Sequence, residues 1–157
     1  MNIIEGQLIA KPYSFAIAVS RFNSTVTEKL LSGVVNCLLR HGAEEKNITA
    51  VWCPGAFEIA QVAQSLVSTK KFDAVICLGC IVRGETPHFD HLASATTRSI
   101  AELAEDCPVP MIYGVLTTDT MEQAMDRAGG KNGNKGWDAA LASLEMIDVL
   151  KRITKKK

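Results

Sequence analysis

The stretch RGETPHFDH, residues 83–91, gathers side chains that can bind a metal ion or move a proton. It holds two histidines three residues apart and two neighbouring acids: His88, His91, Glu85 and Asp90. Two histidines and a carboxylate can ligate zinc, so a metal site is one interpretation. The third histidine of the chain, His41, ends a separate helical pattern, and the nearest cysteines lie within strand-like runs. Since no suitable further ligand remains, we expect no metal here.

The same stretch can bind an anion. Thr86 is a typical N-cap residue and Pro87 a typical first helical residue, so the sequence predicts a helix that begins at this point. Free backbone N–H groups and the positive end of the helix dipole then suit a phosphate. Gly84 lets the backbone approach a ligand closely, and Arg127 offers a counter-charge. The alternative is that Thr86 only caps a helix and Arg127 is a solvated helix residue.

His88 is a candidate proton carrier. A histidine at a helix N-terminus has its protonated form disfavoured by the dipole, so a neutral imidazole is available to take a proton. Beside a phosphate site, it could move protons on a phosphorylated substrate. The alternative is a histidine that only packs or is solvated.

A third group of residues could bind a flat ring. Phe22 offers an aromatic face and Asn23 a polar amide. The segment PGAFE, residues 54–58, offers backbone groups and the carboxylate of Glu58. Together they suit a flat heterocycle that carries a hydroxylated side arm, although a phenylalanine such as Phe22 is, taken alone, more often a core residue than a ring platform.

These candidates must be positioned by a folded framework. Four apolar runs rich in β-branched residues, 14–22, 48–55, 73–82 and 110–119, are typical of strands covered on both faces of a parallel sheet. Helical patterns follow them at about 25–42, 56–70, 88–106, 121–127 and 137–153. The sequence therefore predicts one domain, 1–157, with a flavodoxin-like three-layer α/β/α sandwich around a central parallel four-stranded sheet. The terminal KKK, residues 155–157, is expected to be a solvated tail.

In such folds, ligands bind outside the carboxyl ends of the strands. Those ends carry the segments 20–23, 53–58, 80–88 and 113–119, which hold nearly all of the candidate residues. The first ten residues, MNIIEGQLIA, predict an extra strand that pairs with a neighbouring subunit. The turn GGKNGNKG, residues 129–136, lacks the spacing of a phosphate loop, and its glycines and asparagines indicate left-handed backbone between two helices.

Composition narrows the function classes. The 157 residues carry 17 basic and 17 acidic side chains, so no global charge attracts nucleic acid or an anionic membrane. No apolar run reaches the ~20 residues of a membrane helix, and no signal peptide is recognised. The five cysteines are odd in number and sit mostly in apolar runs, which favours buried thiols in a reducing cytoplasm over disulfides. The spacing of CLGC, 77–80, matches redox motifs, but it lies in a strand-like run rather than at a helix start.

Four motifs are similar to those of lumazine synthase (6,7-dimethyl-8-ribityllumazine synthase), a family of riboflavin biosynthesis. They are RFN (21–23), PGAFEI (54–59), GCIVRGETPHFD (79–90) and EQAMDRAGGKNGNKGWDAA (122–140). The resemblance runs from the N-terminal strand to the last helix, and the order of PGAFEI, RGxTxHF and GNKG is highly specific. It implies condensation of 5-amino-6-(D-ribitylamino)uracil with 3,4-dihydroxy-2-butanone 4-phosphate, without a metal or an organic cofactor.

The resemblance also implies roles for individual residues. His88 would move the proton, and phosphate would be bound by Glu85, Thr86 and Arg127, with Glu85 acting through its backbone because its carboxylate would repel the anion. Phe22 would stack on the pyrimidine, and Tyr113 would close the pocket from the neighbouring subunit. The other substrate-binding residues would be Asn23, Ala56, Phe57, Glu58, Cys80, Ile81, Val82 and Lys135. Tyr113 departs from the phenylalanine frequent in the family, so its hydroxyl needs a partner.

The family assembles as pentamers with sites between adjacent subunits, and in some members twelve pentamers form a hollow 60-subunit shell. The expected partners are therefore two small-molecule substrates and further copies of the chain, and riboflavin synthase remains open as another. Nucleic acid and membrane are not expected. Two other functions stay open: a non-catalytic lumazine- or flavin-binding cage, and an archaeal-type riboflavin synthase that shares the fold.

Overall fold

The computed structural model describes residues 1–154, so the expected KKK tail lies outside the described residues. Four parallel strands form the central sheet, in the order β2-β1-β3-β4. They are β1 (Phe15–Ser20), β2 (Ile48–Cys53), β3 (Ala74–Val82) and β4 (Met111–Thr118). No helix within residues 1–154 is long and apolar enough to cross a membrane.

The register of the strands leaves one of them overhanging. Ser20 pairs with Cys53, so β1 and β2 end at the same level. Val19 pairs with Leu78, and β3 continues to Val82, where it pairs with Thr118 of β4. The last residues of β3 therefore extend beyond the ends of β1 and β2 and form a wall beside the loops that follow those strands.

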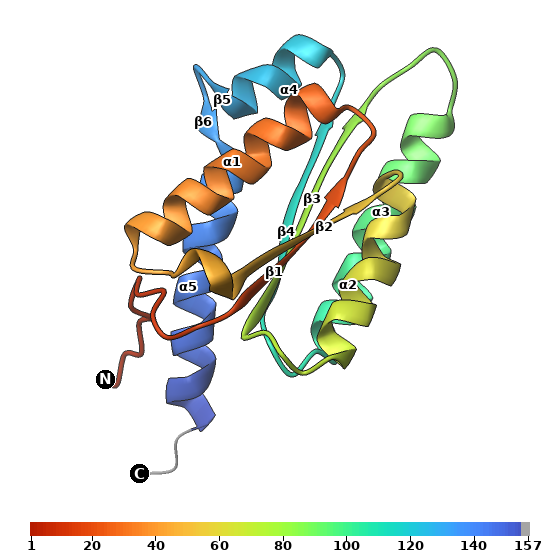
Figure 1. The fold of residues 1–157 in the computed structure, drawn as a ribbon. Helices are drawn as coiled ribbons and strands as arrows, with labels where there is room; N and C mark the ends of the chain where they lie inside the picture. Colours follow the sequence, from red (N-terminus) through yellow and green to blue (C-terminus); the bar gives the residue numbers. More distant parts are fainter. Residues whose placement is uncertain (155–157) are drawn as a thin grey trace.

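Helices cover both faces of the sheet (Figure 1). Helices α1 (Ser24–Arg40), α4 (Met121–Arg127) and α5 (Lys135–Thr154) lie on one face. Helices α2 (Ile59–Ser68) and α3 (His88–Glu105) lie on the other. Two 3-10 turns, η1 (Glu45–Asn47) and η2 (Ala56–Glu58), flank β2. The predicted flavodoxin-like α/β/α architecture is confirmed.

Side chains of the strands alternate between the two helical layers, as the two-residue period of a strand requires. On β1, the large residues Phe15, Ile17 and Val19 pack toward α1 and α5, whereas Ala16 and Ala18 face α2 and α3. All five are fully buried. Because small side chains face α2 and α3, these helices can approach the sheet closely.

The predicted glycine-rich turn is a small hairpin of β5 (Ala128–Gly130) and β6 (Gly133–Asn134). The prediction of left-handed backbone is confirmed, since φ is +111° at Gly129 and +76° at Gly133. Helix α5 begins at Lys135, two residues before the predicted start, because the side chain of Asn134 accepts hydrogen bonds from the N–H groups of Gly136 (2.8 Å) and Trp137 (3.3 Å).

The first nine residues form no strand within this chain, although the N–H group of Gln7 donates to Asp148 on α5 at 2.9 Å. Their apolar side chains are exposed; Ile3 and Ile9 are 63% and 52% accessible. The pairing of this segment with a neighbouring subunit stays a prediction.

Candidate active site

A cleft of about 480 Å³ opens where β1, β2 and β3 end. The loops after these strands and the first turns of α3 supply its lining: Phe22, Asn23, Gly55, Ala56, Phe57, Glu58, Cys80, Ile81, Val82, Gly84, Thr86, His88, Phe89 and Leu92. Every substrate-binding residue predicted on the first three strand ends lies in this lining. The structure thus brings three of the four predicted segments together.

Two phenylalanines stand exposed beside the cleft. Phe22 is 71% accessible and Phe57 is 70% accessible, whereas large aromatic side chains are ordinarily buried. Since both rings line the same cleft from different strand ends, a flat ring bound there can stack on aromatic surface. Apolar exposure of this kind is typical of a binding site rather than of a folding core.

Two polar side chains of the cleft are held by single hydrogen bonds to the backbone. Asn23 adopts the left-handed conformation (φ 60°), and its Nδ2 donates to the carbonyl of Cys80 at 2.8 Å. The Oε2 atom of Glu58 accepts from the N–H group of Gly55 at 2.9 Å. The Oδ1 atom of Asn23 and the Oε1 atom of Glu58 form no hydrogen bond within residues 1–154. Both side chains are therefore oriented and keep one acceptor oxygen for a ligand.

The segment before α3 carries unpaired backbone donors. The N–H groups of Gly84, Glu85 and Thr86 donate to no described residue. Helix α3 begins at His88, as the pattern at 88–106 predicts, but the capping position is held by Pro87 rather than by Thr86. The carbonyl of Pro87 accepts from Asp90 and His91, and the hydroxyl of Thr86 accepts from the N–H of His88 at 3.4 Å. Unpaired N–H groups that precede a helix are the donors an anion requires.

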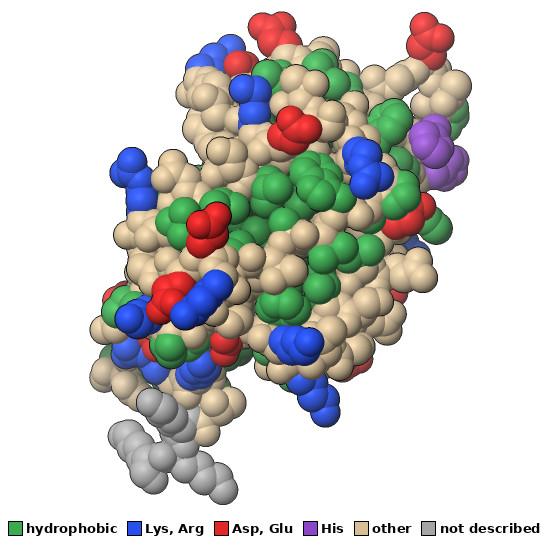
Figure 2. Space-filling model, viewed as in Figure 1, with side chains coloured by type: hydrophobic (Ala, Val, Ile, Leu, Met, Phe, Trp, Pro, Cys, Tyr) green, Lys and Arg blue, Asp and Glu red, His purple; other side chains and the backbone are tan. Residues whose placement is uncertain are grey.

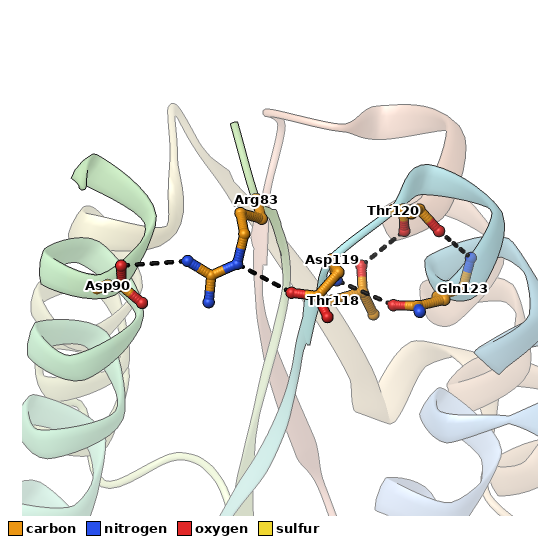
Figure 3. Close-up of polar contacts among 6 residues, drawn as sticks. All are labelled: Arg83, Asp90, Thr118, Asp119, Thr120 and Gln123. Atoms are coloured by element: carbon orange, nitrogen blue, oxygen red, sulfur yellow. Dashed lines mark hydrogen bonds and ion pairs between the residues drawn. The ribbon is translucent and has the colours of Figure 1, made fainter. Parts of the chain in front are cut away.

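No lysine or arginine appears in the lining of this cleft. The nearest basic residue in sequence, Arg83, is engaged elsewhere (Figure 3). Its Nη1 atom lies 3.1 Å from a carboxylate oxygen of Asp90, and its Nε atom lies 2.9 Å from one of Asp119. Because two carboxylates surround one guanidinium, Arg83 has no positive charge to spare for a phosphate.

Arg127 does not line the cleft of its own chain. It lies at the end of α4, where its Nη1 atom donates to the carbonyl of Gln123 at 3.1 Å. It is half-buried and forms no ion pair with any residue of the described range. The predicted pairing of Arg127 with Thr86 in one phosphate site is thus not formed within a single chain.

Tyr113 and Lys135 meet at a second concave surface, formed by β4 and the start of α5. The segment 113–119 was expected at a strand end, but this is wrong for Tyr113, the third residue of β4. The Tyr113 hydroxyl and Thr97 Oγ1 lie 2.9 Å apart, so the hydroxyl has the partner that it needs. Lys135 forms an ion pair with Asp138 (2.8 Å).

The cysteine thiols are poor nucleophiles in this structure. Burial raises the pKa of Cys80 to about 11 and that of Cys77 to about 12. Since the thiolate is the reactive form, neither thiol of CLGC is activated for redox chemistry at neutral pH. All five cysteines are free, and four of them are buried.

The two histidines of 83–91 separate in the structure. His88 lines the cleft, whereas His91 does not. Asp90 is held by Arg83. Among residues 1–154, no three His, Cys, Asp or Glu side chains gather as metal ligands would.

Residue-by-residue reasoning missed two members of the lining, Phe89 and Leu92. Phe89 and Leu92 lie on α3 one and four residues after His88, which places all three near one helix face. That spacing was the available signal. Histidine side chains are visible at the upper right of Figure 2, over the start of α3.

Comparison with known proteins matches this arrangement to one family. The sequence model of 6,7-dimethyl-8-ribityllumazine synthase matches residues 12–151. Two relatives of that name, from two strains of Clostridium kluyveri, are each 48% identical to this chain over 153 residues. The matched region covers 98% of this chain and 99% of each relative. The chain therefore belongs to the 6,7-dimethyl-8-ribityllumazine synthase family.

Proposed function

We propose that this protein condenses 5-amino-6-(D-ribitylamino)uracil with 3,4-dihydroxy-2-butanone 4-phosphate to give 6,7-dimethyl-8-ribityllumazine, phosphate and water. Family membership supports this reaction. The observation that carries the proposal is the single cleft, in which two exposed aromatic rings, oriented polar groups and His88 face a segment of unpaired N–H donors.

The pyrimidine stacks on Phe22, and Phe57 covers the ring or its ribityl arm. Asn23 and Glu58 each offer an acceptor oxygen to N–H or hydroxyl donors of this substrate. Ala56 and residues 80–82 supply backbone groups and apolar walls along the overhanging end of β3. The rigid strand ends thus orient one reactant before the second one binds.

The second substrate places its phosphate against residues 84–86, where Glu85 contributes its N–H group and Thr86 its N–H group and hydroxyl. The ring amine attacks the ketone, and loss of water gives an imine. His88 removes the proton that allows phosphate to leave. The ribitylamino nitrogen then attacks the remaining carbonyl and closes the second ring with loss of a second water. Donors placed around the departing phosphate stabilise its charge. None of these steps calls for a metal or an organic cofactor.

We further propose that a second copy of the chain completes each cleft. A phosphate dianion needs a cation, and the lining of one chain offers none. Arg127 is half-buried without a carboxylate partner, and Tyr113 and Lys135 share a separate concave surface. In the assembled enzyme, Arg127 of one copy would bind the phosphate held by its neighbour, while Tyr113 and Lys135 would close the pyrimidine end.

The proposed assembly is a pentamer. Strand β2 is an edge strand of the sheet, and Figure 2 shows apolar side chains gathered over the middle of the face where β2 runs between α1 and α2. The N-terminal segment, with exposed Ile3 and Ile9, suits addition to such an edge in a neighbouring copy. A shell of twelve pentamers and an association with riboflavin synthase extend this proposal. Five free thiols suit a cytoplasmic enzyme.

The decisive assay supplies the purified protein with both substrates and follows lumazine absorbance and free phosphate together. We expect the two products in equal amounts, and neither product when one substrate is omitted. An inactive protein that still binds lumazine would instead be a binding or cage protein. Formation of riboflavin from lumazine alone would identify a riboflavin synthase.

A further inference from the structure

Arg83 connects three parts of the molecule around the cleft (Figure 3). Its backbone N–H extends the β3–β4 ladder by donating to the carbonyl of Thr118 at 2.9 Å. Its guanidinium binds Asp90 in the first turn of α3 and Asp119 after β4 through two different nitrogen atoms. Its Cζ atom also lies 4.2 Å from the ring centroid of Phe89, a residue of the cleft lining.

The segment between Arg83 and α3 has few other attachments. The N–H groups of residues 84–86 are unpaired, and a side chain at Gly84 would meet nothing within 4 Å. The hydrogen bond between Thr86 and the N–H of His88 is long, at 3.4 Å. Apart from the packing of Phe89 and Leu92 against the core, the position of this segment and of the first turn of α3 therefore depends largely on Arg83.

Asp119 is itself held in place. Its N–H group donates to Gln123 Oε1 at 2.9 Å, and the Thr120 hydroxyl caps α4 by accepting from the N–H of Gln123 at 3.1 Å. Thr118 Oγ1 donates to the carbonyl of Thr120 at 2.9 Å. Hydrogen bonds thus fix the turn after β4, and Arg83 links this turn to the first turn of α3.

Loss of the two Arg83 ion pairs should affect the reaction rate much more than the stability of the fold. The side chain of Arg83 is 44% exposed and those of its two partners are 61% and 67% exposed. Exposed ion pairs of this kind contribute little to stability, so their loss leaves the fold intact. A displacement of about 1 Å at a reacting group, in contrast, can slow a reaction by roughly 10²-fold.

We propose that Arg83 is a positioning residue that fixes residues 84–88 and Phe89 over the cleft by joining Asp90 to Asp119. The proposal rests on the function proposed above, since it names what holds the phosphate segment and His88. It assigns no direct phosphate contact to Arg83, because both carboxylates already occupy its guanidinium.

The test compares Arg83→Met, Arg83→Lys and Asp119→Asn in the full-length assembled protein. Arg152→Met is the matched control, because Arg152 is 42% exposed and pairs with Asp148 on α5, outside the cleft. Amide hydrogen exchange of Asp90 and His91, whose N–H groups donate to the carbonyl of Pro87, reports the position of the first turn of α3 without any substrate. Turnover, the KM of each substrate and the Kd of 6,7-dimethyl-8-ribityllumazine report the site.

For Arg83→Met and Asp119→Asn, we expect faster exchange at Asp90 and His91 and unchanged exchange in β1 and α1. We expect kcat to fall between about tenfold and a hundredfold and the KM of the phosphorylated substrate to rise. The Kd of the lumazine, which binds the ends of β1 and β2, should stay within twofold. Arg83→Lys should be intermediate, because one ammonium cannot reach both carboxylates as the fork does. In the double variant Arg83→Met/Asp119→Asn, the decrease in kcat should be smaller than the two single decreases combined.

Unchanged exchange at Asp90 and His91 in Arg83→Met overturns the proposal, whatever the turnover. The proposal is also overturned if exchange in β1 and α1 accelerates as much as exchange in α3, since Arg83 would then only stabilise the fold. Additive losses in the double variant would separate Arg83 from Asp119 and have the same consequence. If the wild-type protein is inactive, the proposed function is contradicted. The exchange measurement then still tests whether Arg83 positions the first turn of α3.

Discussion

His88 and His91 lie on the same helix, yet only His88 lines the cleft. Relative to His88, Phe89 and Leu92 lie about 100° and 40° around the helix in one direction, whereas His91 lies about 60° in the other, away from these two residues of the cleft lining. His88 also follows directly on the segment of unpaired N–H donors. A proton carrier at this point can serve the elimination of the phosphate bound there.

Replacing His88 with alanine should slow turnover and leave binding almost unchanged. We expect kcat to fall on the order of 10- to 100-fold, because orientation of the two reactants persists without the proton transfer. The Kd of 6,7-dimethyl-8-ribityllumazine should change by less than about twofold. Steady-state kinetics and fluorescence titration measure the two quantities.

His91→Ala is the matched control, since His91 is an exposed histidine on the same helix. It should retain wild-type kcat. A larger loss in His91→Ala than in His88→Ala would contradict the assignment of the proton carrier.

Tyr113 carries a hydroxyl that the phenylalanine frequent in the family lacks, and this hydroxyl needs a hydrogen-bond partner. Its hydroxyl lies 2.9 Å from Thr97 Oγ1 on α3, so the polar group is satisfied within its own chain. The ring itself is 42% accessible on β4. The aromatic face, rather than the hydroxyl, is therefore the part that can close a neighbouring cleft.

Tyr113→Phe should keep kcat/KM within about threefold and lower the free energy of unfolding by about 0.5–1 kcal/mol, the loss of one exposed hydrogen bond. Tyr113→Ala should weaken the pyrimidine substrate much more, because it removes the ring. Equal losses in the two variants, measured by steady-state kinetics, would assign the role to the hydroxyl instead.

The helices and strands could largely be predicted from hydrophobic spacing. Val26, Leu30, Val34 and Leu38 recur every fourth residue, and all four are fully buried on α1. The near-continuous apolar run of β3 is buried over eight of its nine residues, as a strand covered on both faces requires. These patterns are local, and burial of one helix face or strand determines them.

Element boundaries at special residues were predicted less well. Pro87 takes the capping position because its carbonyl accepts the hydrogen bonds that begin α3, and this geometry is not encoded in residue preference alone. The hairpin at 128–134 was expected only as a turn, since strands of two or three residues carry no periodic signal. The early start of α5 had an available signal, an asparagine directly before the helix.

Asn134 links two elements, and its replacement should be measurable. Its Oδ1 atom caps α5, and its Nδ2 atom donates to the carbonyl of Lys29 on α1 at 3.0 Å. Asn134→Ala should lower the free energy of unfolding by about 1–2 kcal/mol. Asn134→Asp should lower the free energy of unfolding by less than Asn134→Ala, because aspartate keeps an oxygen that can cap α5. Denaturant unfolding at fixed protein concentration measures both variants.

Asn132→Ala is the control for this series. Asn132 lies in the same hairpin, it is exposed, and its side chain forms no hydrogen bond within residues 1–154. A loss in Asn132→Ala as large as that in Asn134→Ala would contradict the capping role.

At the scale of the whole molecule, the buried thiols couple stability to alkaline pH. Burial raises the pKa of Cys37 and Cys80 from 9.0 to about 11 and that of Cys77 to about 12. Above pH 9 the unfolded chain loses these protons while the folded chain keeps them. The stabilisation is therefore fully present below pH 9 and is lost as the pH rises toward 11–12.

The temperature at the midpoint of thermal unfolding should thus decrease as the pH is raised from 9 to 11. Over this range each buried thiol lowers the free energy of unfolding by up to about 1.4 kcal/mol per pH unit. Cys80→Ala should show a shallower decline than the wild type over this range. Parallel declines in the two proteins would mean that Cys80 ionises equally well in the folded and unfolded states.

The expected completion of each cleft by a neighbouring copy was implied by the family resemblance and not by any pattern along the chain. Spacing along the chain placed Arg127 after the fourth strand, but it does not tell whether that arginine faces its own cleft or a neighbour's. The order β2-β1-β3-β4 leaves β4 at the sheet edge farthest from β2, with Tyr113 near its start. The folded chain leaves Tyr113, Lys135 and Arg127 outside the lining of its own cleft, and the closure of a neighbour's cleft by Tyr113 stays a prediction.

The most direct test of a cleft completed by a second copy is subunit complementation between His88→Ala and Arg127→Ala. Each variant alone should be impaired, and Arg127→Ala should chiefly raise the KM of the phosphorylated substrate. When the two are unfolded, mixed in equal amounts and refolded together, clefts with both native residues form wherever a His88-bearing copy meets an Arg127-bearing neighbour. We predict that lumazine formation in the mixture rises clearly above the mean of the separately refolded variants. Activity equal to that mean would contradict the account, because it would mean that His88 and Arg127 act within the same chain.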